Sequence, residues 1–196
     1  MNKLNDHLQD ISEIRSIMER TSKFLSLSGL AGVSAGITAL IGSYAAYQRL
    51  AQASGENLLD FFIIDAGLVM IAAIGFAIFF TIRMAKRKHL PIWSSSTKYL
   101  LANLLVPLVA GKVFCLIAWQ HGVVLFIPPA TLLFYGLALT SASKYTSREV
   151  YFLGLAEIVL GLAAFMFLDY WLILWAIGFG LLHIVYGIFM YLKYEK

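Results

Sequence analysis

The apolar residues of this chain fall into six long runs that are separated by short polar segments. The runs cover approximately Phe24–Gln48, Leu58–Met84, Thr97–Trp119, Val123–Ser141, Ser147–Leu168 and Trp171–Leu192. A helix of about 20 apolar residues is long enough to cross a hydrocarbon core about 30 Å thick. Each run must be helical there, because lipid offers no hydrogen-bond partner to the backbone. The pattern predicts an all-α, multi-pass membrane domain over residues 24–192, with residues 193–196 as a short tail.

Residues 1–23 follow a different pattern. Apolar side chains recur at Leu4, Leu8, Ile11, Ile14 and Met18, the spacing of an amphipathic helix. Acidic and basic residues are balanced in this segment, so it lacks the basic excess of a helix that binds anionic lipid. Two interpretations stay open: a helix lying on the membrane surface, or a helix that docks a protein partner or a second copy of the chain.

Charge gives the six runs an orientation. Only 13% of residues are charged, 60% are hydrophobic and the mean hydropathy is +0.79, far from the balance of a soluble protein. With six spans, all of the 15 Lys and Arg residues except Arg49 and Lys112 fall on the side of the N-terminus. The positive-inside rule then predicts that both termini are cytoplasmic. Because the basic residues flank spans, the net charge of +4 does not indicate nucleic-acid binding.

Glycines recur at helical spacing in three of the spans. The first span carries Gly29 and Gly36, the fifth Gly154 and Gly161, and the sixth Gly180 and Gly187. Small residues at such spacing let membrane helices approach closely, so we expect these six glycines to mark packing faces. The turn at Asp169 and Tyr170 is very short, which makes the last two spans antiparallel neighbours. The expected fold is therefore three helical hairpins, either as a true triplication or as a repeated packing solution.

The succession Gly154, Gly161, Gly178 and Gly187 in a six-span chain resembles the HdeD-like family of bacterial inner-membrane proteins. The likeness is clearest over residues 154–191 and fainter elsewhere. The turn at Asp169 departs from the proline that often turns that family's hairpins. The resemblance implies a six-span inner-membrane protein connected with acid and stress resistance, and it carries over no catalytic residue.

Four ionisable residues lie within the spans: Asp65, Lys112, Glu157 and His183. Such groups are costly in lipid and are functional candidates for that reason. Glu157 and His183 are both roughly 18–20 Å from the last turn at 1.5 Å per residue, which places them at one level near the midplane. Each is flanked by glycines, so we expect the two side chains to meet. Their contact is either a buried hydrogen bond that fixes helix register, or a proton relay or cation-binding site.

Asp65 and Lys112 form a second candidate pair, because each lies about two turns below the end of its span. The alternative for Lys112 is a side chain that extends to the membrane surface. Four further residues in the middle hairpin suggest a helix kink or a polar site: Asn103, Pro107, Pro128 and Pro129. Pro128 and Pro129 could equally shape the start of a helix.

No motif in the sequence indicates catalysis. There is no His-Glu-x-x-His pattern, no cysteine pair, no phosphate-binding glycine loop and no nucleophile elbow. We therefore expect no cofactor, no metal and no enzymatic activity. The expected function is an envelope-stress or partner-binding module, with the lipid bilayer, a homo-oligomer and a protein docked on the N-terminal helix as partners. The alternative is a small proton-coupled or cation transporter that uses Glu157 and His183.

Overall fold

The computed structural model describes residues 28–52, 58–89 and 92–196. Its described part contains helices and turns and no strand. Six helical segments are long and apolar enough to cross a membrane: Gly29–Ala51, Asp60–Arg87, Ser95–Gln120, Val124–Tyr145, Arg148–Met166 and Leu168–Tyr194. The six predicted spans are thus confirmed, with ends within a few residues of those expected. The amphipathic helix predicted over residues 1–23 lies outside the described residues.

Four of the six spans are single helices, the fourth span has a short 3-10 turn at each end, and the sixth begins with one. In chain order they are α2 (Gly29–Ala51), α3 (Leu58–Arg87), α4 (Ser95–Gln120), η1 (Val124–Phe126), α5 (Ile127–Ala142), η2 (Ser143–Tyr145), α6 (Arg148–Met166) and η3 (Leu168–Tyr170). The sixth span is divided into α7 (Trp171–Trp175), the π-helix η4 (Ala176–Leu182) and α8 (His183–Tyr194). The hydrophobic pattern did not predict this π-helix.

Local sequence explains two of the helix starts. Ser94 precedes α4 and forms a capping box with Thr97, in which each side-chain oxygen accepts a hydrogen bond from the other residue's backbone N–H. Pro128 and Pro129 lie in the first turn of α5. Proline has no backbone N–H, but in the first turn this costs nothing, because no earlier helical carbonyl is present to accept a hydrogen bond. These prolines therefore begin a helix and do not kink one.

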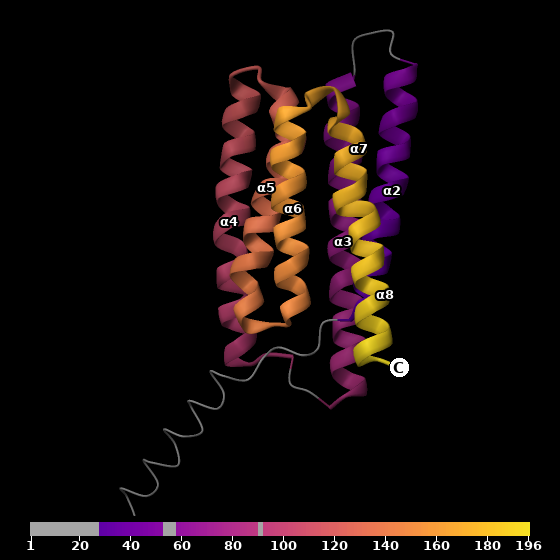
Figure 1. The fold of residues 1–196 in the computed structure, drawn as a ribbon, viewed down its shortest axis with the longest axis vertical. Coiled ribbons are helices and arrows are strands. Elements are labelled where there is room, and N and C mark those ends of the chain that lie inside the picture. The colour runs from indigo at the N-terminus through magenta and orange to yellow at the C-terminus, as the bar shows by residue number, and fades with distance from the viewer. Residues whose placement is uncertain (1–27, 53–57, 90–91) are drawn as a thin grey trace, which may run out of the picture.

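The helices form two bundles of three spans each (Figure 1). We call α4, α5 and α6 the middle bundle, and α2, α3 and the sixth span the terminal bundle. Within them, α5 packs along both α4 and α6, and α2 packs along both α3 and the sixth span. The predicted grouping into three hairpins is not confirmed, because α6 lies mainly on α5 while the sixth span lies mainly on α2. The short η3 turn still joins α6 to α7.

Glycines bring the backbones together within each bundle. A Cβ added to Gly187 of α8 would lie 2.5 Å from the carbonyl oxygen of Gly29 in α2, and one added to Gly36 would lie 2.6 Å from that of Gly180. A Cβ on Gly154 of α6 would lie 2.8 Å from the carbonyl oxygen of Gly136 in α5. Because real Cβ contacts do not come so close, each of these positions admits only glycine at the observed spacing.

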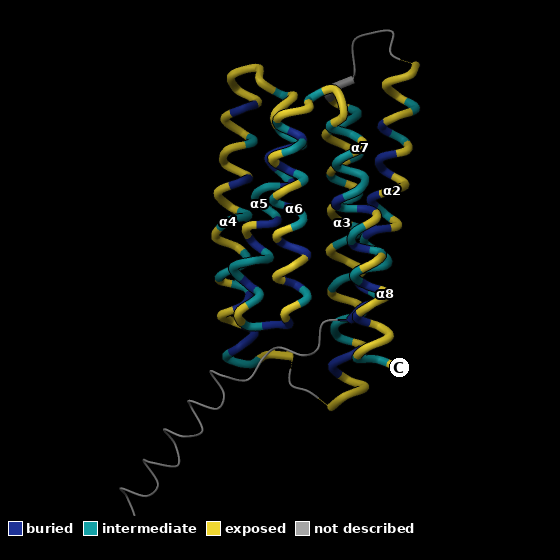
Figure 2. The backbone as a smooth tube through the Cα atoms, in the orientation of Figure 1, coloured by how far each residue is buried: buried dark blue, intermediate teal, exposed yellow. Residues whose placement is uncertain are grey.

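Apolar side chains also cover the outside of the structure. Figure 2 shows exposed residues along the outward sides of the helices and buried residues where the helices face each other. Large exposed apolar side chains occur on every span, among them Ile41, Ile71, Val106, Val159, Met166 and Leu192. Such a surface is unfavourable in water and suits contact with lipid. The described residues are consistent with a multi-pass membrane protein.

Lys and Arg side chains gather at one end of the structure, which we call the basic end. There α3 and α8 finish and α4 and α6 begin. The described basic residues at this end include Lys86, Arg87, Lys88, Lys98, Lys144, Arg148, Lys193 and Lys196.

Candidate functional site

Glu157 and His183 meet at the junction of the two bundles. Glu157 lies midway along α6 and has no exposed surface, and His183 begins α8 and is 6% exposed. The His183 Nδ1 atom is 3.4 Å from Oε1 of Glu157. The contact expected from the depth of the two residues is therefore present, and it joins the middle bundle to the terminal bundle.

The neighbours of His183 define which ring nitrogen carries a proton. Its Nδ1 atom is 3.0 Å from the carbonyl oxygen of Gly178, which can only accept a hydrogen bond. Nδ1 must therefore be protonated. In the neutral ring Nε2 is then an acceptor, so the Tyr135 hydroxyl, 2.9 Å away, donates to it. The Nδ1–H group also faces Glu157, which gives a polar chain from Tyr135 through His183 to the carboxyl group.

Gly178 makes room for the carboxyl group. A Cβ at this position would lie 2.6 Å from Oε2 of Glu157 and 2.5 Å from Cδ2 of Leu132. Gly178 belongs to the π-helix η4, whose wider turn brings its carbonyl oxygen to the ring of His183 five residues later. Single π-helical turns occur often at functional sites. Here the π-helix supplies both the space for Glu157 and a hydrogen-bond acceptor for His183.

The carboxyl oxygens of Glu157 are poorly satisfied. Neither accepts a hydrogen bond of good geometry from the described residues, and the Nδ1–H of His183 is the near donor. A buried polar group without full hydrogen bonding is costly, and the cost is larger for an unpaired charge. The junction therefore holds a buried carboxyl group to which no described residue donates a hydrogen bond of good geometry.

Aromatic rings fill the junction on the side away from the basic end. The Phe179 ring lies 5.1 Å from that of Tyr135 and 4.8 Å from that of Trp175, measured between centroids. The indole N–H of Trp175 donates to Oγ1 of Thr131 in α5 at 3.2 Å. The polar chain is therefore bounded on this side by packed rings.

The glycines beside Glu157 and His183 do not face each other. Gly154 and Gly161 of α6 contact α5, and Gly180 and Gly187 of the sixth span contact α2. Each glycine face therefore packs on a helix of its own bundle, and the two faces do not pack on each other. Glu157 reaches the sixth span at Gly178, one of the two glycines of η4.

The structure does not bring Asp65 and Lys112 together. Asp65 lies on α3 near Gly42 of α2, and a Cβ on that glycine would be 3.5 Å from its carboxylate. Lys112 is exposed on α4, which packs against α5 in the other bundle. Equal depth placed the two residues at one level but not on neighbouring helices.

The candidate kink residues of the middle hairpin have local roles. The side-chain amide of Asn103 donates to the carbonyl oxygen of Tyr99 one turn earlier, at 2.8 Å. Pro107 lies inside α4, which continues through it. Pro107 has no N–H, so the carbonyl oxygen of Asn103 lacks its usual helical donor. Neither residue reaches the Glu157 site.

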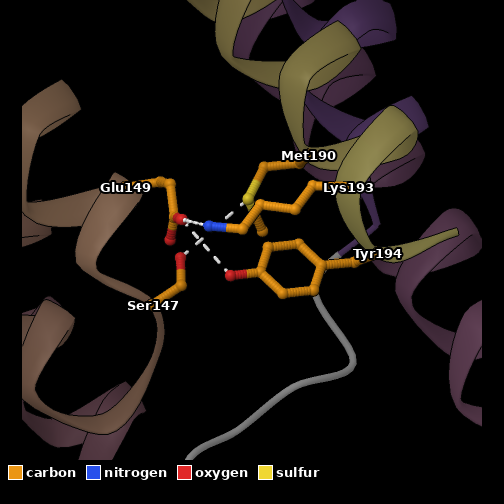
Figure 3. A network of polar contacts seen from close by, with 5 residues as sticks. All are labelled: Ser147, Glu149, Met190, Lys193 and Tyr194. Carbon is orange, nitrogen blue, oxygen red and sulfur yellow. Dashed lines mark hydrogen bonds and ion pairs between the residues drawn. The ribbon is translucent and has the colours of Figure 1, made fainter.

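A second polar cluster joins the bundles at the basic end. Figure 3 shows Lys193 and Tyr194 of α8 directed at the Glu149 carboxylate of α6, with Ser147 and Met190 beside them. The Lys193 ammonium forms an ion pair with Glu149, and the Tyr194 hydroxyl donates to it at 3.2 Å.

Residues 194 and 195, at the end of α8, also form hydrogen bonds with the start of α2 and the end of α3. The Glu195 carboxylate accepts hydrogen bonds from the backbone N–H of Gly29 and the hydroxyl of Ser28, at the start of α2. Lys88 after α3 donates to the carbonyl oxygen of Tyr194 at 2.7 Å. A negative charge at a helix N-terminus is favourable, so Glu195 serves as a cap supplied from the far end of the sequence.

Sequence reasoning missed three contributors to the site: Tyr135, Gly178 and the π-helix. Tyr135 is one of ten tyrosines, and its partner is 48 residues away. Gly178 stood out only as part of the glycine succession. A residue-by-residue pattern has no signal for a π-helix whose cause is packing.

Comparisons with known proteins found no match: no family model, no curated protein and no solved structure matches the chain. The likeness to the HdeD-like family stays a prediction. Among the residues that the structure describes, no three His, Cys, Asp or Glu side chains are grouped so that they could hold a metal ion.

Proposed function

We propose that this protein is a small, non-enzymatic proton-coupled or cation transporter in which Glu157 is the proton-binding group. The observation that carries the proposal is the fully buried Glu157 beside His183, at mid-length of the spans and at the junction of two bundles. Coupling-ion sites of membrane transporters lie at such a position, between two structural halves near the midplane. An ionisable residue within the membrane is a functional candidate because it is costly to keep there.

The pair gives protonation a mechanical consequence. One proton can be held by the Glu157 carboxyl group or by the His183 imidazole, and the pair is neutral overall in both arrangements. Adding a second proton or removing the first leaves an unbalanced charge between the bundles. An unpaired buried charge is strongly unfavourable, so either step favours separation of the bundles and entry of water. Proton binding is thereby coupled to the relative position of the two bundles.

The orientation and compartment belong to this proposal. The concentration of Lys and Arg at the basic end supports a cytoplasmic position for that end and for both termini. The likeness to a bacterial inner-membrane family supports the plasma membrane of a bacterium as the location.

A second function is favoured by a separate observation. The α3 helix packs along α2, and apolar side chains such as Ile64, Leu68 and Ile71 are exposed on its other sides. A stress-response or partner-binding module would use such a helix to contact another membrane protein or a second copy. The mass of the protein in detergent micelles tests the homo-oligomer, and a purely monomeric species would count against it.

Reconstitution into liposomes tests the transport proposal. Proton flux down an imposed pH gradient is followed with an enclosed pH-sensitive dye. We expect flux with the unaltered protein, and flux at the level of protein-free liposomes with Glu157→Gln. The matched control is Asp65→Asn, which removes the other intramembrane carboxyl group and should leave the flux unchanged. Absence of flux in the unaltered protein, or equal loss in both variants, would overturn the proposal.

A further inference from the structure

Two charged side chains lie unpaired on the outside of the spans. Asp65 of α3 is partly exposed, and Lys112 of α4 is exposed. Within the part of the chain that the structure describes, neither side chain forms an ion pair or a hydrogen bond. A charged group inside the membrane is costly and almost always faces a partner or water. A single copy of the chain therefore leaves both groups without the partner that their position calls for.

Lys112 interrupts an apolar face of α4. Leu105, Val109 and Leu116 lie on the same face at helical spacing, and all three are exposed. The other side of α4 packs along α5. This face of α4 therefore presents one positive charge on a surface that is otherwise apolar and faces lipid.

Asp65 lies at the contact between α2 and α3. A Cβ on Gly42 of α2 would be 3.5 Å from its carboxylate, so the charged group lies over the backbone of α2. Ile41, next to Gly42, and Leu68, one turn after Asp65, are exposed. We call this part of α2 and α3 the acidic face. It presents one negative charge among apolar side chains that face lipid.

The two charges lie at the same depth. Asp65 is seven residues after Leu58, where α3 begins. Lys112 is eight residues before Gln120, where α4 ends. Both of these helix ends lie away from the basic end, so at 1.5 Å per residue the two charges are roughly 10–12 Å below that side. Copies of one chain share one orientation in the membrane. Equal depth is therefore the condition for a contact between these groups in two neighbouring copies.

The two charges also lie on different parts of the molecule. In Figure 1, α4 and α2 form opposite edges of the row of helices, and α3 packs along α2. A contact between α4 of one copy and the acidic face of the next joins two different surfaces. Such a head-to-tail contact repeats from copy to copy and ends when a ring closes.

We propose that copies of this chain associate head to tail in the membrane, with Lys112 of one copy paired to Asp65 of the next. The occupant of the acidic face is α4 of a second copy, because that helix carries the opposite charge at the same depth. The contact rests on the second proposed function, in which α3 meets a second copy, and adds the helix and the ion pair that form it. Transport by Glu157 does not depend on this contact, because Glu157, His183 and Tyr135 all belong to one copy.

Energy transfer between copies in liposomes tests the pairing. Copies that carry a donor or an acceptor fluorophore after Lys196 are mixed, and energy transfer is measured as the protein is diluted with lipid. A polar contact between membrane helices changes the association constant by about 3- to 20-fold. Reversal replaces this attraction by repulsion, so we expect Asp65→Lys and Lys112→Asp each to lower the association constant by about 10-fold or more.

A mixture of the two reversal variants isolates contact between copies from any other role. The Asp65→Lys copies keep Lys112, and the Lys112→Asp copies keep Asp65, so alternating copies have an opposite pair at every contact. We expect the mixture to regain the energy transfer that each variant loses alone. The smaller changes Asp65→Asn and Lys112→Gln keep the side-chain shape and should lower the association constant by about 3-fold or more, which keeps the test valid if a reversed side chain is not tolerated.

The matched control is Lys98→Asp, which reverses an exposed charge of α4 at the basic end and should leave association unchanged. Equal loss in this control, or no recovery in the mixture, would overturn the ion pair. Equal association of all variants would also overturn it and would leave the second proposed function standing, whereas a protein that stays monomeric at every dilution would overturn both. Flux in liposomes decides transport separately, because Asp65→Asn should weaken association without lowering the flux.

Discussion

The contact between α2 and α8 predicts the effect of one methyl group. In Gly187→Ala the new Cβ would lie 2.5 Å from both the Gly29 carbonyl oxygen and the Val33 nitrogen, whereas ordinary contact begins at 3.4 Å. The two helices must therefore separate by about 0.9 Å, because both obstructing atoms belong to the backbone and cannot rotate away. Overpacking of this kind costs about 1–3 kcal/mol of the free energy of unfolding.

A second glycine serves as the control for this prediction. A Cβ added to Gly75 of α3 would have nothing within 4 Å, so Gly75→Ala carries the change in helix propensity without the collision. That change favours alanine by about 0.5–1 kcal/mol in both variants. The difference between the two variants isolates the packing cost at the α2–α8 contact.

Reversible unfolding in mixed detergent and SDS micelles, followed by circular dichroism, measures both free energies. We expect Gly187→Ala to unfold at lower SDS content than the unaltered protein, and Gly75→Ala at equal or higher content. Equal stability of the two alanine variants would refute the close approach of α2 and α8, and with it the arrangement of the terminal bundle.

Three further effects can be measured in the same way. Tyr135→Phe leaves Nε2 of His183 without a donor and should lower the free energy of unfolding by about 1–3 kcal/mol; no change would mean that the tyrosine is not a donor there. Glu195→Gln removes the charge that caps α2 and should cost about 0.3–1 kcal/mol, less at high salt, and a salt-independent loss would argue against the charge effect. Lys193→Met should lower the free energy of unfolding only slightly, because its side chain is 47% exposed and water screens the ion pair; a large loss would show that the ion pair is shielded from water.

The spans could be predicted from the sequence because lipid imposes helix on every long apolar run, whatever the neighbouring helices are. The start of α5 is likewise independent of the neighbouring helices, because Pro128 and Pro129 favour the first turn of a helix through their own backbone chemistry. Features that depend on a single helix could therefore be predicted from the pattern of residues.

Which helices are neighbours was not accessible in that way. The position of a residue within its span predicts only its depth in the membrane. By depth, Glu157 is level with His183, and Asp65 is level with Lys112. Only the first pair is in contact, because the position of each helix in the membrane plane is set by packing across the whole structure. For the last two spans, the short η3 turn also predicts that the helices lie side by side. No comparable constraint in the described residues links α3 to α4.

The π-helix was not predictable for a related reason. Its sequence, AIGFGLL, reads as any apolar helical stretch. The wider turn is stabilised by what lies against it, the Glu157 carboxyl group at Gly178 and the close approach of Gly180 to α2. A helix geometry that results from tertiary contacts leaves no trace in local periodicity.

The pairing of the first described helix with the last has a consequence for biosynthesis. The middle bundle consists of consecutive helices and can pack as soon as α6 has entered the membrane. The glycine face of α2 must wait until α8 has been synthesised, and so must the cap of α2, because Glu195 directly follows α8. A nascent chain therefore holds α2 paired with α3 but without α8 while α4, α5 and α6 are being made. Ribosome stalling or premature termination before α8 would release chains with one complete bundle and with the glycine face of α2 unpaired, a form suited to recognition by membrane proteases.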